Sequence, residues 1–281
     1  MSVTWYSDEP PPAHDVPGWA WPLVVLRIVL LVALIAPCFL LLLTVRSIEK
    51  PLSGLRRPVS PWITYFVCRG ALLIIGLKLV LRGQPMEGRG AIVANHSSWL
   101  DIFVLNATDC VYFVSKVEVA SWAGIGALAK ATGTVFITRD RKDAKSQADL
   151  FETRLLAGHR LLFFPEGTST DGLRVLPFKS TLFAAFFAPS LRDEIRVQPV
   201  SVTYHAPLGQ DARFYGWWGD TGFGEHLLTV LGSVRRGRVE VTYHAPLRVS
   251  EYADRKALAQ AGEVAVRGDH GYANKLATAV S

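Results

Sequence analysis

The stretch AIVANHSSWLD, residues 91–101, sets the expectation for the fold, because it joins a short apolar run to a polar turn. The first four residues are typical of a buried strand. His96 then emerges where the strand ends, and loops at strand ends often carry functional residues. Asp101 follows five residues later, and a carboxylate can fix the tautomer of an imidazole and stabilise its protonated form. With no serine or cysteine in a nucleophile motif beside it, His96 is interpreted as a base for a hydroxyl of the substrate. A helix start capped by Asn95 or Ser97 is the alternative explanation.

The composition narrows the classes of function. The chain has 281 residues, of which half are hydrophobic, and a formal charge of +6. This balance favours anionic partners such as a phosphorylated metabolite or an anionic membrane surface. Basic residues do not alternate with aromatic residues in a stripe, so nucleic acid is not expected as a partner. The cysteines Cys38, Cys68 and Cys110 are odd in number and form no CxxC motif, so we expect neither a metal site nor disulfides.

An apolar segment near the N-terminus indicates a membrane anchor. Residues 28–45 carry no charge and are bracketed by Arg27 and Arg46. At ~1.5 Å per residue a straight helix of this length covers roughly 27 Å, slightly less than a hydrocarbon core of about 30 Å. Two interpretations remain open, a helix that spans the bilayer and a half-inserted anchor kinked at Pro37. The flanking charges place the rest of the chain on the cytoplasmic side. They are Asp8, Glu9 and Asp15 before the segment, and Arg46, Lys50, Arg56 and Arg57 after it.

A second apolar stretch, residues 62–81, contains Arg69 and Lys78. Two internal charges argue against a second span. An interfacial helix or a helix packed on the following domain is expected instead.

Beyond Gly83, short apolar runs alternate with helical patterns, which predicts an α/β layer architecture with ligand groups at the strand ends. We divide the chain into a polar leader (1–27), a membrane-anchoring helical region (28–82), a catalytic domain (83–250) and a C-terminal helix with a tail (251–281). The heptapeptide VTYHAPL occurs at 202–208 and at 241–247, and is interpreted as two strands that end in similar turns.

Three further blocks carry polar residues directly after apolar runs. GTVFITR (133–139) ends in Arg139, and arginine can bind phosphate oxygens through two hydrogen bonds. FPEGTST (164–170) contains Gly167 beside hydroxyl residues, which lets an anion approach the backbone closely. VQPV (197–200) could line an acyl channel.

Together, and in this order, the four blocks resemble the glycerolipid acyltransferase family, whose patterns are NHxSxxD, GxxFIxR, FPEGTxS and VxPV. The resemblance covers roughly residues 85–210. It implies a mixed sheet flanked by helices, with an N-terminal hydrophobic helix or helix pair that anchors the enzyme in the membrane. It also implies an O-acyltransferase of the cytoplasmic (inner) membrane of a bacterium, which acylates the hydroxyl of a lysolipid.

The family's roles transfer to matching positions of this chain. His96 would be the base and Asp101 its orienting carboxylate. Arg139 and Glu166-Gly167-Thr168 would bind the acceptor, with Glu166 expected to hold Arg139 or a backbone amide. Lys116, after the apolar run 111–114, is a weaker candidate for contact with the thioester or phosphate.

The co-substrate would be acyl-CoA or an acylated acyl carrier protein, and an activated thioester requires no metal or redox cofactor. The favoured acceptor is 1-acyl-sn-glycerol-3-phosphate, which would give phosphatidic acid. The third motif usually ends in Thr-Arg-Ser, whereas this chain has Ser169 in place of the arginine. FPEGTSTDG (164–172), VQPV (197–200), WWGD (217–220) and EHLL (225–228) resemble the branch that acylates lyso-ornithine lipid. Lyso-ornithine lipid, alone or together with the glycerol phosphate, is therefore the alternative acceptor, and Ser169 is compatible with either. A thioesterase or lipid hydrolase, and a lipid-binding membrane protein, are the alternatives outside the transferases.

Overall fold

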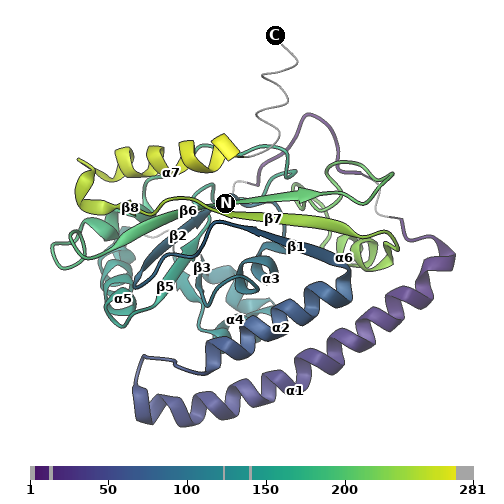
Figure 1. The fold of residues 1–281 in the computed structure, drawn as a ribbon, viewed down its shortest axis with the longest axis horizontal. Helices are drawn as coiled ribbons and strands as arrows, with labels where there is room; N and C mark the ends of the chain where they lie inside the picture. Colours follow the sequence, from purple (N-terminus) through teal and green to yellow (C-terminus); the bar gives the residue numbers. More distant parts are fainter. Residues whose placement is uncertain (1–3, 13–14, 123, 139–140, 270–281) are drawn as a thin grey trace.

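Within the described residues, the strands form one mixed sheet, with β2 (Gly90–Ala94) and β5 (Arg160–Phe163) near its centre (Figure 1). The computed structural model describes residues 4–12, 15–122, 124–138 and 141–269. The strands are β1 (Leu77–Arg82), β2 (Gly90–Ala94), β3 (Tyr112–Lys116), β4 (Val135–Ile137), β5 (Arg160–Phe163), β6 (Arg196–His205), β7 (Gly237–Tyr243) and β8 (Leu247–Arg248). The α-helices are α1 (Trp21–Ser53), α2 (Ser60–Ile75), α3 (Asp101–Asn106), α4 (Ile125–Thr132), α5 (Ala144–Leu156), α6 (Phe223–Gly232) and α7 (Arg255–Asp269).

The order of strands across the sheet is β1-β7-β6-β2-β5-β3-β4, and β8 pairs with β6. Strands β6, β2, β5, β3 and β4 are all parallel to their neighbours in this series. Their carboxyl ends therefore meet at one edge of the sheet, where open α/β sheets bind ligands. Strand β7 is antiparallel to β6 and parallel to β1. The two copies of VTYHAPL thus end two adjacent strands, as their interpretation predicted.

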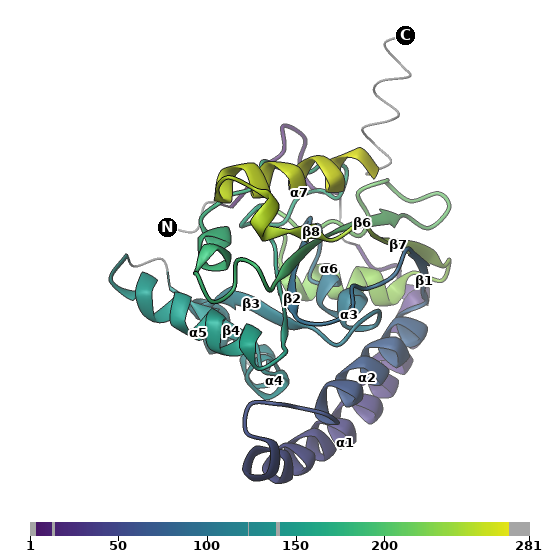
Figure 2. The same cartoon turned by 60° about the vertical axis from the view of Figure 1, so that its left-hand side comes forward.

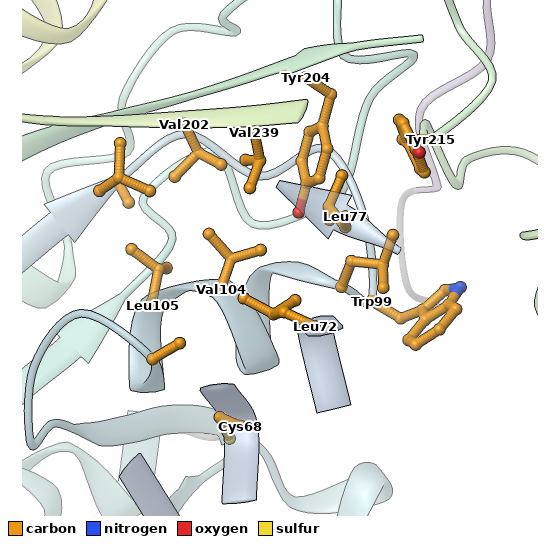
Figure 3. Packing of buried hydrophobic residues seen from close by; sticks show 14 of the residues in the cluster. Cys68, Leu72, Leu77, Trp99, Val104, Leu105, Val202, Tyr204, Tyr215 and Val239 are labelled. Carbon is orange, nitrogen blue, oxygen red and sulfur yellow. The ribbon is translucent and has the colours of Figure 1, made fainter. Parts of the chain in front are cut away.

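Helices cover both faces of the sheet, because the central strands are apolar on both sides. Every residue of β2 is buried. One core cluster joins the sheet to α2, α3 and α6 and includes Leu72, Leu105 and Leu231 (Figure 3). A second cluster joins the opposite face to α5, α7 and the 3₁₀ helix η4 (Leu182–Phe187). Figure 2 shows α7 on one side of the sheet and α1 with α2 on the other. The prediction of an α/β sheet flanked by helices is confirmed.

Helix α1 is apolar on nearly all sides and has 33 residues. It is the helix, among the described residues, that is long and apolar enough to cross a membrane by length and composition. Helix α2 runs beside it and is shorter (Figures 1 and 2). The inner face of α2 packs Cys68, Leu72 and Ile75 into the core, while Phe66 remains 65% exposed. The expectation that the second apolar stretch is not another span agrees with this packing.

The boundaries of the N-terminal region differ from those we predicted. The membrane-anchoring helical region was placed at 28–82, but its second helix ends at Ile75 and Leu77–Arg82 form a strand of the sheet. The physical reason is Gly76, whose φ of +83° caps α2 in the left-handed region that glycine adopts without steric cost. The first helix also begins earlier, at Trp21, because the apolar pattern already starts within the leader. Helix α6, which the sequence did not predict, covers the sheet near α1.

Candidate active site

His96 and Asp101 lie in direct contact where β2 ends. Nδ1 of His96 is 2.7 Å from Oδ2 of Asp101. Because a carboxylate can only accept, this contact makes Nδ1 the protonated nitrogen and leaves the lone pair on Nε2. The imidazole side chain is 20% exposed, whereas the Asp101 side chain is fully buried. The pair therefore presents a base whose tautomer is fixed from inside the protein.

Asp101 is held by four donors. Oδ2 also accepts hydrogen bonds from the backbone N–H groups of Ser97, at 2.8 Å, and Ser98, at 3.0 Å. Oδ1 accepts a 2.7 Å hydrogen bond from the hydroxyl of Tyr204 on β6. These four hydrogen bonds hold the buried carboxylate in one position. Asp101 is also the first residue of α3, but the N-cap of this helix is Leu100 and it makes no side-chain capping bond, so the alternative of a helix start capped by Asn95 or Ser97 is wrong.

Tyr204 is a site residue that the sequence analysis missed. Its side chain points into the core beside Leu77 and Tyr215 (Figure 3). Burial and the negative charge of Asp101 raise the pKa of Tyr204, so the hydroxyl remains a donor. The one sequence signal for this residue is its place in the heptapeptide VTYHAPL, which occurs twice in the chain. Only the parallel pairing of β6 with β2 brings Tyr204 to Asp101.

Asn95 fixes the loop that carries His96. Its carboxamide exchanges two 2.8 Å hydrogen bonds with the backbone of Val202, donating to the carbonyl and accepting from the N–H. The side chain thereby continues the pairing between β2 and β6 beyond the last strand residue. Asn95 itself is completely buried. The conformation of the His96 turn is thus set by the sheet.

Glu166 and Phe164, which follow β5, support His96 from the other side. Oε1 of Glu166 accepts the backbone N–H of His96 at 2.7 Å, and Oε2 accepts that of Leu176 at 2.7 Å. The Phe164 ring stacks on the imidazole with the centroids 4.0 Å apart and the planes 11° from parallel. The sequence analysis expects Glu166 to hold either Arg139 or a backbone amide, and the structure shows a backbone amide on each of its two oxygens. Glu166 is therefore placed to position the base.

Burial dominates the ionisation of Glu166. The carboxyl group is 1% exposed, and this desolvation raises its pKa to about 8. The two amide hydrogen bonds act in the opposite direction, and the nearby Asp101 charge adds to the increase. The neutral form of Glu166 therefore persists to a higher pH than that of an exposed glutamate.

Gly167 and Thr168 form the turn after Glu166. The N–H of Gly167 closes the turn on the carbonyl of Phe164 at 3.0 Å, and its φ is +76°. A Cβ at this position would lie 2.9 Å from Nζ of Lys179, so glycine keeps the turn open beside a cation. Thr168 is half-buried and accepts a 3.3 Å hydrogen bond from the N–H of Trp5. The next residue, Ser169, points inward and donates its hydroxyl to the carbonyl of Trp217.

The remaining predicted site residues follow β3 and β4. Lys116 is the last residue of β3, which is two strands from β2 and therefore roughly 10 Å away at ~4.8 Å per strand. Arg139 lies outside the described residues. The glycine that begins its motif, Gly133, ends α4 with a φ of +88° and accepts a 2.7 Å hydrogen bond from buried Arg154 on its carbonyl. This glycine has a structural role.

The geometry suits the removal of a proton from a hydroxyl group, followed by its return to a leaving group. In such a step His96 would supply Nε2 and Asp101 would balance the charge that develops, while Phe164 and Glu166 contact the ring and its backbone. The base is presented at the edge of the sheet where the turns after β2 and β5 converge.

Three comparisons bear on this site. Residues 80–203 match the family model described as Acyltransferase. A Rhodobacter capsulatus protein named lyso-ornithine lipid O-acyltransferase is 53% identical over 95% of this chain and 97% of its own length. A Neisseria gonorrhoeae 1-acyl-sn-glycerol-3-phosphate acyltransferase is 33% identical over 71% of this chain and 77% of its own. The crystal structure of the Thermotoga maritima 1-acyl-sn-glycerophosphate acyltransferase has the same fold, with a TM-score of 0.61 and 17% identity over 90% of this chain and 95% of that one.

Proposed function

This chain belongs to the acyltransferase family and is an O-acyltransferase of lysolipids, and on that premise we propose that its acceptor is a lyso-ornithine lipid. The observation that carries the proposal is the 53% identity to a lyso-ornithine lipid O-acyltransferase over almost the full length of both chains. Relatives named for glycerol phosphate are less similar and cover less of the chain. Of the two acceptors that the sequence left open, the similarity thus favours the second.

The third motif supports this choice of acceptor. Where the family pattern has an arginine, Ser169 is 9% exposed and its hydroxyl is bound to the carbonyl of Trp217. A phosphate dianion is recognised best by paired guanidinium donors. A serine turned into the protein cannot replace them. A head group without phosphate fits this loop better.

The reaction uses His96 twice. Nε2 removes the proton from the acceptor hydroxyl while its oxygen attacks the carbonyl carbon of the acyl thioester. The C–S bond then breaks, and the proton held on Nε2 passes to the departing thiolate of coenzyme A or acyl carrier protein. The products are an ester and a free thiol. Asp101 stabilises the imidazolium between these steps, and a positioned base of this kind contributes about 10²–10⁴-fold in rate.

The enzyme is associated with the membrane, and we place α1 along the bilayer surface, half-inserted, with the catalytic domain in the cytoplasm. Near its start, Arg27 donates to the carbonyls of Leu231 and Ser233 at 2.8 Å. Arg46, ~28 Å further along the helix, donates to the carbonyl of Ala131 at 3.3 Å. Both points of α1 are thus attached to the same domain, which favours a helix that runs beside it (Figure 1).

The exposed side of this helix layer is apolar. Leu40 on α1 is 65% exposed and Phe66 on α2 is 65% exposed. An apolar surface of this kind is expected to enter the acyl region of one leaflet. The exposed cations Lys50 and Arg56, at the end of α1 and just after it, are then available to the anionic cytoplasmic surface. This arrangement keeps the active site close to a substrate that resides in the membrane.

The test is an acceptor comparison with purified protein in detergent. Release of free thiol from acyl-CoA is measured with lyso-ornithine lipid, with 1-acyl-sn-glycerol-3-phosphate and without acceptor. We expect turnover with the first, little with the second, and loss of turnover in His96→Ala but not in the matched control His205→Ala. Equal rates without acceptor would indicate a hydrolase. Lipid binding without turnover would indicate a binding protein, and preference for the glycerol phosphate would refute the choice of acceptor.

A further inference from the structure

The N-terminal leader lies across the loop that follows the third motif. The N–H of Trp5 donates to Thr168 at 3.3 Å. Further along, the hydroxyl of Tyr6 donates to Asp220 at 2.9 Å, and the carboxylate of Glu9 is 3.0 Å from the guanidinium of Arg213. These contacts join the leader to two loops, residues 164–180 and 211–221. The leader is therefore part of the surface beside Thr168.

Arg174 is the cation that the leader covers. Its guanidinium lies over the Trp5 ring, 5.0 Å from the centroid. Nε and Nη2 of Arg174 contact the Asp171 carboxylate, with the shortest distance 2.9 Å from Nη2 to Oδ2. The Asp171 side chain is 1% exposed, whereas that of Arg174 is 47% exposed. One edge and one face of the guanidinium are thus fixed, and the edge formed by Nη1 and Nη2 can take a second carboxylate.

The loop that carries Arg174 is attached to the catalytic turn. The N–H of Thr170 donates to the carbonyl of His96 at 3.0 Å. The hydroxyl of Thr170 is 3.3 Å from that same carbonyl and 3.3 Å from the carbonyl of Arg174. A ligand held by Arg174 is therefore fixed relative to the base.

Arg174 supplies the positive charge that Ser169 does not. Ser169 and Arg174 belong to the same loop, but Ser169 is turned toward Trp217 while Arg174 reaches solvent. In this loop Arg174 is an exposed cation that is oriented by the Trp5 ring and the buried Asp171 carboxylate. An N-acylated ornithine retains its α-carboxylate, a single planar anion that matches one guanidinium edge.

We infer that Arg174, held by Asp171 and covered by Trp5 of the leader, binds the carboxylate of the acceptor head group, and that Trp5 thereby determines acceptor specificity. This inference rests on the proposed function. Arg174 is a binding residue, and Trp5 acts through it as a positioning residue.

The experiment pairs changes in the enzyme with a change in the acceptor. Initial rates are measured for the full-length wild type, Arg174→Gln, Arg174→Lys and Trp5→Ala with lyso-ornithine lipid and with its carboxyl methyl ester. For the natural acceptor we expect KM to increase about 10- to 100-fold in Arg174→Gln, less in Arg174→Lys, and about 3- to 10-fold in Trp5→Ala. KM for acyl-CoA stays unchanged. The methyl ester should be a poor acceptor for the wild type and no poorer for Arg174→Gln.

Arg192→Gln is the matched control, because Arg192 is also an exposed arginine over an aromatic ring, Phe187 at 5.7 Å, but lies outside the two loops. We expect it to leave both KM values unchanged. If Arg174→Gln weakens the acid and the ester by the same factor, or leaves both unchanged, the inference is wrong while the proposed function stands. If the wild type does not acylate lyso-ornithine lipid, the proposed function fails and this inference fails with it. Thermal unfolding of each variant separates a loss of binding from a loss of fold.

Discussion

Replacing Asp101 with asparagine should separate the electrostatic role of the carboxylate from its structural role. Oδ2 accepts hydrogen bonds from the backbone N–H groups of Ser97 and Ser98 and from Nδ1 of His96. These donors compel the carboxamide oxygen of Asp101→Asn to occupy the Oδ2 position. The amide nitrogen then takes the Oδ1 position and can donate to the Tyr204 hydroxyl oxygen, which also accepts. Every hydrogen-bonded pair can thus remain, with the direction of the Tyr204 pair reversed, while the negative charge is lost.

The charge matters when His96 becomes protonated. For charge centres ~4 Å apart and an effective dielectric constant of about 20, the attraction is about 4 kcal/mol. In Asp101→Asn a hydrogen bond to a neutral group replaces the one to the carboxylate, so part of this attraction is lost. Each ~1.4 kcal/mol lost from the stabilisation of the imidazolium lowers the rate tenfold. We therefore expect kcat to fall by about 10²–10³-fold. KM for both substrates should change little, because neither substrate contacts Asp101 in the proposed mechanism.

The assay is thiol release at saturating acceptor and donor, together with thermal unfolding in the same detergent. Asp101→Ala is the contrasting variant, since it leaves the two backbone N–H groups and the Tyr204 hydroxyl without their acceptor at about 1–3 kcal/mol each. We expect it to lower Tm far more than Asp101→Asn does. If Asp101→Asn retains more than half of the wild-type kcat, the carboxylate charge does not stabilise the imidazolium and the reasoning is refuted.

Four further outcomes follow from other parts of the structure. Glu166→Gln should lower stability by about 1–3 kcal/mol, because a carboxamide can accept only one of the two buried amides, and an unchanged Tm would contradict this. Folding raises the pKa of Glu166 from the unfolded value of 4.5 to about 8, so the stability that this group contributes is greatest below pH 4.5 and is lost as the pH rises toward 8. The free energy of unfolding in urea should therefore fall more steeply with pH for the wild type than for Glu166→Gln. Ser169→Arg should destabilise the protein by more than about 2 kcal/mol, since residue 169 faces the Trp217 carbonyl and is 9% exposed. It should create no activity toward a phosphate acceptor, and a gain of that activity would show that the loop can turn outward. Leu41→Lys, at a residue 52% exposed on α1, should reduce co-flotation with anionic vesicles, whereas Leu208→Lys, at a residue 81% exposed after β6, should not; equal effects would place the membrane contact elsewhere.

Much of this site could be predicted because its residues follow apolar runs. His96 lies two residues after the end of β2, and Glu166 lies three residues after the end of β5, between Phe164 and Gly167. Since parallel strands end at one edge, the order of runs and polar turns indicated which side chains would converge. The uncharged stretch around Ile28 likewise predicted an apolar helix, which is present as α1. Each of these features is local in sequence.

Other features depend on contacts between segments far apart in the chain. Tyr204 reaches Asp101 because β6 pairs with β2, and Trp5 covers Arg174 because the leader folds back onto the loop after β5. The strand Leu77–Arg82 was assigned to the anchor, because its pattern alone does not reveal that β7 will pair with it.

The sequence by itself determined the α/β class, the apolar anchor and the pair His96–Asp101, since strand period, helix length and residue spacing are properties of neighbouring residues. The tertiary structure alone decided how the carboxylate is held, where the cation of the acceptor loop lies and how α1 runs along the domain. The physical reason is that a hydrogen bond or an ion pair depends on distance in space, and the pairing of distant strands and loops creates those distances only when the whole sheet has formed.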